Sequence, residues 1–140
     1  MEMTKEKLNQ YRALKKEIAS LEKAIDKLRD RAMDIQEVMG KVTGSSRDFP
    51  YIEEHITVRM DEPKEADMIT RRIRIKEKRK GEAEKAALEI EQFIAGIPDS
   101  TDRQIFEFVY LDGKRQREVA EAIGYSRGRI SQKISQYLKD

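Results

Sequence analysis

Residues 115–134 read RQREVAEAIGYSRGRISQKI and have the pattern of two short helices joined by a turn. Ala120 is small where two helices must approach closely, and Gly124 follows where the first helix must stop and the chain must reverse. Apolar residues recur at the spacing that places both helices over one shared core: Val119, Ile123, Tyr125, Ile130 and Ile134. The stretch therefore predicts a helix-turn-helix.

The second helix of this motif has an apolar side and a polar side. Ser126 is a good N-cap for it, and Ile130 and Ile134 set its inward direction. In helix-turn-helix proteins the N-terminal part of the second helix meets base edges in the major groove, where Arg pairs with guanine and Gln with adenine. The predicted base-reading residues are Arg127, Arg129, Gln132, Lys133 and Gln136.

Phosphate contacts are expected near the starts of the two helices, where free backbone amides and basic side chains favour anions. The predicted phosphate-binding residues are Lys114, Arg115, Arg117 and Ser126. A preceding helix is predicted over residues 101–111, with Ser100 as its cap and a turn at Asp112-Gly113. Residues 99–140 are thus expected to form a three-helix domain that binds double-stranded DNA.

The composition limits what the rest of the chain can be. The chain has 140 residues, 40% of them charged, and no cysteine, whereas ordinary globular domains are about one quarter charged. Since the apolar residues recur periodically, long helices with solvated faces are favoured over disorder. No apolar run approaches the roughly 18 residues of a membrane span or the roughly 7 to 15 of a signal-peptide core. We expect a cytoplasmic protein with no membrane partner.

The N-terminal region shows a heptad pattern from Tyr11 to Val42, with apolar residues at alternating steps of three and four. It predicts a helix from about Thr4 to Met39, roughly 50 Å long at about 1.5 Å per residue. Gly40 and Gly44 are expected to end this helix.

A loop and a short strand are predicted next, within residues 40–62. Residues 45–50 have the composition of a loop, and residues 55–60, HITVRM, alternate apolar and polar side chains as a half-buried strand does. Such a strand needs a partner, either Tyr51-Ile52 or the same strand of a second copy.

A second long helix is predicted from about Pro63 to Ala95, with stop signals at Gly96 and Pro98. Its predicted inward positions are Ala66, Ile69, Ile73, Ala83, Ala87, Ile90 and Ile94. Lys76 and Lys80 fall on the same face and interrupt it.

The predicted fold is therefore mainly α. Residues 1–98 form an elongated helical or coiled-coil region, followed by the helix-turn-helix domain. Whether the long helices pair within one chain as a hairpin or between chains as a coiled coil stays open, and a homo-oligomer formed through them is predicted. The basic run from Arg71 to Lys80 fits a solvated helix face, with contact to flanking DNA phosphates as the alternative.

An enzyme is not expected from this sequence. His55 is the sole histidine, and the chain has neither a metal-ligand spacing nor a glycine-rich phosphate loop after a strand. The carboxylates are spread along amphipathic helices and none is paired with a nucleophile and a base. We expect no catalytic residue, no metal and no cofactor.

The stretch from Asp102 to Leu138 resembles region 4 of bacterial sigma factors, through DRQIF, YLDGK, EVAEAIGYS and the spaced Ile130 and Ile134. The whole layout, with Phe49-Pro50-Tyr51 before that domain, is similar to small phage regulators of the RinA and ArpU type. This resemblance implies transcriptional activation of phage or prophage late genes, with RNA polymerase as a partner.

Two other functions are compatible with the same pattern. One is a small terminase-like subunit that recognises phage DNA for packaging, and the other is an RNA polymerase adaptor that does not touch DNA. Ring-shaped oligomers would favour the first, and absence of salt-dependent DNA binding would favour the second.

Overall fold

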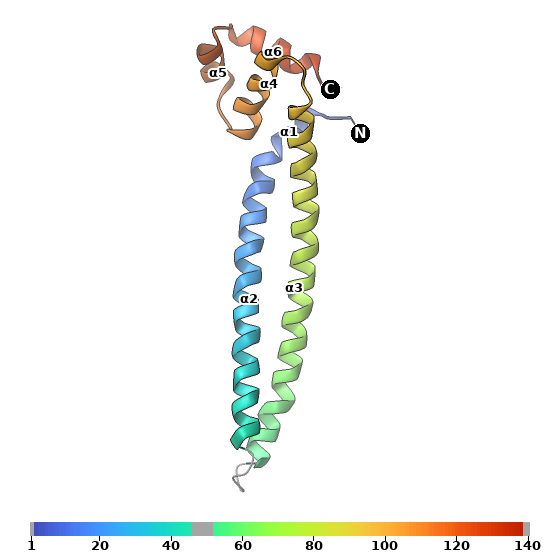
Figure 1. Ribbon diagram of the computed structural model, residues 1–140, viewed down its shortest axis with the longest axis vertical. Helices are drawn as coiled ribbons and strands as arrows, with labels where there is room; N and C mark the ends of the chain where they lie inside the picture. The colour runs from blue at the N-terminus through green and yellow to red at the C-terminus, as the bar shows by residue number, and fades with distance from the viewer. Residues whose placement is uncertain (1, 46–51, 139–140) are drawn as a thin grey trace. The chain divides into compact units, whose positions relative to one another are not determined.

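The computed structural model describes residues 2–45 and 52–138, and the side chains of residues 2–36 and 64–138. The elements in chain order are α1 (Lys5–Asn9), α2 (Tyr11–Ser45), α3 (Ile52–Ala95), α4 (Ser100–Phe106), the π-helical turn η1 (Glu107–Leu111), α5 (Gln116–Ile123) and α6 (Arg127–Gln136) (Figure 1). The described residues are mainly helical, as predicted.

The chain divides into two compact units. The core unit consists of Met1–Ile18 and Glu82–Asp140, and the long-helix unit of Ala19–Gly81. The predicted domain boundary after residue 98 stays a prediction, since in the core unit the end of α3 packs with the three-helix domain.

The core unit is organised around the fully buried side chain of Phe106. The Phe106 ring contacts the rings of Phe93, Tyr110 and Tyr137, with centroids 6.0, 5.7 and 5.7 Å away. The same apolar cluster includes residues from every helix of the unit: Leu8, Tyr11, Ile90, Ile94, Ile105, Val119, Ile130 and Ile134. Burial of this apolar surface is the main stabilising contribution to the unit.

Local signals set most helix ends in the core unit. The Ser126 hydroxyl accepts the Arg129 N–H at 3.1 Å, and Gly124 ends α5 with φ +87°, both as predicted. The predicted cap at Ser100 is wrong, because Asp99 is the N-cap of α4 and its carboxylate accepts the Asp102 N–H at 2.9 Å. A carboxylate is also favoured there by the helix dipole.

The predicted helix over residues 101–111 is present in two parts. It runs as α4 to Phe106 and then as the π-helical turn η1, which widens the helix over residues 107–111. Lys114 N–H then donates to the Phe108 carbonyl at 2.8 Å and closes the turn at Gly113, where φ is +72°. The predicted turn at Asp112-Gly113 is thereby confirmed.

In the long-helix unit α2 and α3 run antiparallel within one chain. Ion pairs join Arg29 to Glu77 at 2.5 Å and Glu22 to Lys80 at 3.4 Å, and a third joins Arg31 to Glu65. The buried side chains form a narrow stripe: Leu21, Ile25, Ile35 and Ile69. An antiparallel helix pair inside the chain is thus present, whereas pairing between chains stays a prediction.

The predicted second-helix seam is largely confirmed. Five of its positions are buried: Ile69, Ala83, Ala87, Ile90 and Ile94. Ala66 and Ile73 are half-buried, and so are Lys76 and Lys80, the two lysines expected to interrupt the seam.

The predicted strand at residues 55–60 is wrong, because these residues lie in α3. A lone strand would need a partner for its backbone groups, whereas a helix satisfies them within its own segment. The predicted helix start at Pro63 is also wrong, since α3 begins at Ile52. The Phe49-Pro50-Tyr51 segment and the predicted loop residues after Ser45 lie outside the described residues.

The ends predicted for the first long helix differ from those observed. Gly40 and Gly44 lie inside α2, which continues to Ser45, and a break at Gln10 separates α1 from α2. Each interior glycine disfavours the helix by only about 1 kcal/mol relative to alanine, which is too little to end a helix without a further stop signal. Within the described residues, no helix has both the length and the apolar character to cross a bilayer.

Candidate nucleic-acid interface

The outward face of α6 is the candidate site, and its direction is fixed by the side chains on the other face. Ile130 and Ile134 are buried in the core of the unit, at 0% and 1% exposure. The left-handed Gly124 turns the chain before α6, and the Ser126 cap holds its first turn. By helical periodicity Gly128, Gln132 and Ser135 therefore lie opposite the two isoleucines, with Arg129 and Gln136 flanking that outer face.

Four of the five predicted base-reading side chains are exposed: Arg127, Arg129, Gln132 and Gln136. A shallow hollow is lined by Ser126, Gly128, Arg129, Gln132, Lys133 and Gln136. A Cβ at Gly128 would meet no atom within 4 Å, so the surface at the start of α6 is open. These hydrogen-bonding groups extend along the helix that would enter a major groove.

Arg129 is held in one direction by an aromatic neighbour. Its guanidinium carbon lies 4.3 Å from the centroid of the Tyr125 ring, a cation–π distance. Stacking leaves the in-plane N–H groups of the guanidinium available for hydrogen bonds. This arrangement suits a bidentate pairing with guanine.

Lys133, the fifth predicted base-reading residue, has a protein partner. Its Nζ lies 3.7 Å from Oδ1 of Asp102, a carboxylate that is 3% exposed. Base contact by Lys133 stays a prediction, and the ion pair adds a positioning role.

Asp102 also binds the C-terminal end of α6. Its Oδ2 accepts the Tyr137 hydroxyl at 2.5 Å, and this hydrogen bond, followed by desolvation, raises the pKa of Tyr137 to about 12. The cluster of Asp102, Lys133 and Tyr137 therefore ties α4 to α6. Sequence reasoning gave these residues no joint role, because the two segments are far apart in the chain.

The predicted phosphate-binding side chains Lys114, Arg115 and Arg117 are exposed around the start of α5. Lys114 Nζ lies 4.6 Å from the centroid of the Phe108 ring. Arg115 is the N-cap residue of α5, but its side chain makes no hydrogen bond to the first turn of the helix. Its guanidinium therefore has no capping role. Ser126 combines its predicted phosphate contact with an observed structural role as the α6 cap.

Arg12 is a further cation near this surface that sequence reasoning missed. A Cβ built at Gly113 would overlap the Arg12 side chain, so Arg12 packs directly on the turn that precedes Lys114. Both residues belong to the core unit. No local signal in the sequence brings residue 12 to this turn.

The helix arrangement of the core unit agrees with a comparison against known families. Residues 99–139 match the family described as sigma-70, region 4. The chain carries a sigma-70 region 4 domain. This domain is a DNA-binding helix-turn-helix of transcription proteins, and it extends over the exposed face of α6 and the start of α5. Neither a curated protein nor a solved structure matches the chain.

Proposed function

We propose that this protein is a sequence-specific DNA-binding regulator of transcription that acts with RNA polymerase on phage or prophage late genes. The observation that carries the proposal is the outward face of α6, where Arg129 and Gln132 are exposed in a sigma-70 region 4 domain. No described carboxylate pairs with Arg127 or Arg129, so both cations are available to a nucleic acid.

The proposed division of labour follows the positions of the side chains. Base reading is assigned to Arg127, Arg129, Gln132, Lys133 and Gln136, and phosphate binding to Lys114, Arg115, Arg117 and Ser126. Base contacts give sequence preference, whereas phosphate contacts give affinity and register. The role needs no catalytic residue, metal or cofactor.

The late-gene role and the polymerase partner rest on the resemblance to phage regulators and on the region 4 domain. A homo-oligomer formed through the long helices is part of this proposal. Two copies would present two α6 helices to successive half-sites, which in duplex DNA lie about one helical turn apart.

The test begins with selection of preferred duplexes from a random pool by the full chain. Arg129→Ala should then weaken binding to the preferred site by about 1–3 kcal/mol and reduce discrimination against single-base variants. Lys114→Ala should weaken binding to every duplex similarly and lower the salt dependence by about one phosphate contact.

Equal losses on all sequences for both variants would contradict these roles. Absence of any salt-dependent binding would instead support an adaptor that does not bind DNA. Ring-shaped oligomers coupled to a packaging ATPase would support the terminase-like function.

A further inference from the structure

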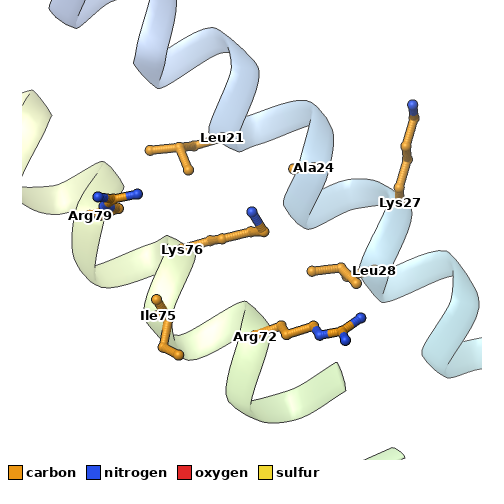
Figure 2. Close-up of a pocket in the computed structure, with 8 residues that line it drawn as sticks. All are labelled: Leu21, Ala24, Lys27, Leu28, Arg72, Ile75, Lys76 and Arg79. Atoms are coloured by element: carbon orange, nitrogen blue, oxygen red, sulfur yellow. The ribbon is translucent and has the colours of Figure 1, made fainter. Parts of the chain in front are cut away.

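A groove of about 550 Å³ lies between α2 and α3 in the long-helix unit (Figure 2). Its apolar lining consists of Leu21, Ala24 and Leu28 from α2 and Ile75 from α3. Ile75 is 64% exposed, so α2 leaves most of its side chain uncovered. The groove therefore offers apolar surface that this chain leaves in solvent.

The same groove is lined by four cations: Lys27, Arg72, Lys76 and Arg79. No carboxylate is among the described side chains that line it, and no described carboxylate forms an ion pair with any of the four. Figure 2 shows Arg72 and Lys76 reaching from α3 toward α2. Their charges thus lie beside the apolar residues without an ion pair to a described carboxylate.

The groove is open because the α3 seam is interrupted. Lys76 is half-buried at a position where an apolar side chain would be needed to close the contact with α2. Met68, Arg72 and Ile75 follow one another on one face of α3 at helical spacing, and Met68 is 51% exposed. An alternating apolar and cationic stripe therefore follows this edge of the groove.

We infer that the groove binds an amphipathic helix with acidic flanks, supplied by a partner protein. Such a helix lays its apolar ridge on Leu28 and Ile75, and its carboxylates pair with Arg72 and Lys76. Duplex DNA fits less well, because it has phosphates but no apolar ridge to cover Ile75. A second copy docked groove to groove would bring like charges together, so the proposed homo-oligomer would use another face of the long helices.

The inference stands apart from the DNA-binding proposal, because none of the groove residues lies in the region 4 domain. It gives the basic run of α3 a binding function in addition to keeping the helix soluble. The occupant is defined by chemistry: an apolar ridge at helical spacing, with Glu or Asp on both sides.

The probe is a synthetic helical peptide of about 20 residues, or about 30 Å, with Leu along one face and Glu on both flanks. Binding to the full chain is measured by fluorescence anisotropy. Two control peptides accompany it: one with Lys in place of every Glu, and one with the acidic composition scrambled to remove the apolar ridge. We expect saturable binding of the acidic amphipathic peptide only.

Two protein variants locate the binding site. Arg72→Glu with Lys76→Glu should lower the affinity at least about tenfold, and Ile75→Ser should lower it about fivefold while leaving thermal unfolding unchanged. The matched control is Arg74→Glu with Lys78→Glu, which makes the same charge change at two exposed positions outside the groove. It should alter the affinity less than about threefold, because exposed charges that do not line the groove make no direct ion pair with the peptide and contribute little.

Several outcomes would overturn the inference. They are an equal loss in the control variant, equal binding of the scrambled peptide, or no peptide binding at all. Loss of duplex DNA binding in the Arg72 and Lys76 variant, without an effect on the peptide, would assign the groove to nucleic acid. Loss of self-association on sedimentation would assign it to a second copy. In either case the DNA-reading role of α6 is tested separately by Arg129→Ala.

Discussion

The core unit and the long-helix unit are built from the same residue types but hold together differently. In the core unit Ile105, Phe106, Val119 and Ile130 are all 0% exposed. Among the described side chains of the long-helix unit a narrow stripe is buried, while Met33, Met68 and Ile75 are 63%, 51% and 64% exposed. Packing thus fixes the direction of α6 in the core unit. The described side chains of the long-helix unit are instead mostly exposed charges and uncovered apolar groups. The same kind of substitution should therefore have different effects in the two.

The largest difference is expected for truncation of an apolar side chain. Phe106→Ala should lower the free energy of unfolding by about 3–5 kcal/mol, because it removes a ring packed against Phe93, Tyr110 and Tyr137. Ile75→Ala should change it by less than about 0.5 kcal/mol, because that side chain is already in solvent. Chemical denaturation of both variants measures the contrast. Similar losses would show that the long-helix unit has a packed core of its own.

The second difference concerns charged pairs. Asp102→Ala should cost about 1–3 kcal/mol, since it leaves the Tyr137 hydroxyl and the half-buried Lys133 without their carboxylate partner. Arg29→Ala removes the exposed Arg29–Glu77 pair and should cost less than about 1 kcal/mol. Denaturation at low and high salt tests this, because only the exposed pair is strongly screened. An Asp102→Ala variant as stable as the parent would contradict the positioning role of the cluster.

The effect of replacing a glycine by alanine on the free energy of unfolding should have opposite signs in the two units. Gly113→Ala places a Cβ at φ +72° and against the Arg12 side chain, so we expect a loss of at least about 1–2 kcal/mol. Gly81→Ala should instead stabilise α3 by about 0.5–1 kcal/mol, because a Cβ there meets no atom within 4 Å. Thermal unfolding of the two variants gives the signs. The control is Gly124→Ala. Gly124 also has a left-handed backbone, with φ +87°, but a Cβ there meets no atom within 4 Å, so this variant measures the backbone strain without the Arg12 contact.

The smallest expected effect depends on pH. The pKa of Tyr137 is raised from 10.0 to about 12, so its hydrogen bond to Asp102 stabilises the fold below pH 10 and is lost as the pH rises through about 12. The stability gap between the parent and Tyr137→Phe should therefore be constant at neutral pH and close above pH 10. Unfolding curves at increasing pH measure this gap. A gap that widens with pH would contradict the hydrogen bond.

Local signals explain what could be predicted from the sequence. The left-handed Gly124, the Ser126 cap and the buried Ile130 and Ile134 were all predicted, because each depends on residues within a few positions. The exposure of Arg129 and Gln132 followed from the same helical periodicity. The seam of α3 was predicted for the same reason, including its interruption by lysine.

Contacts between distant segments explain what was missed. Asp102 meets Tyr137, and Arg12 covers Gly113, across separations that no local pattern encodes. The strand prediction at residues 55–60 failed for a related reason. The alternating pattern is local, and it cannot supply the second strand that a sheet needs. The exposed cationic groove likewise depends on how α2 and α3 face each other.

The central claim is that the outward face of α6 lies against base edges in the major groove. Because the chain contains no cysteine, Gln132→Cys introduces a unique thiol on that face and can be crosslinked to a duplex that carries a thiol-tethered base in the preferred site. The control is Gln104→Cys, which is also exposed but lies on α4. We predict rapid disulfide formation for Gln132→Cys and none above background for Gln104→Cys. Equal crosslinking of both thiols, or none from Gln132→Cys on a duplex that the variant binds, would contradict the account.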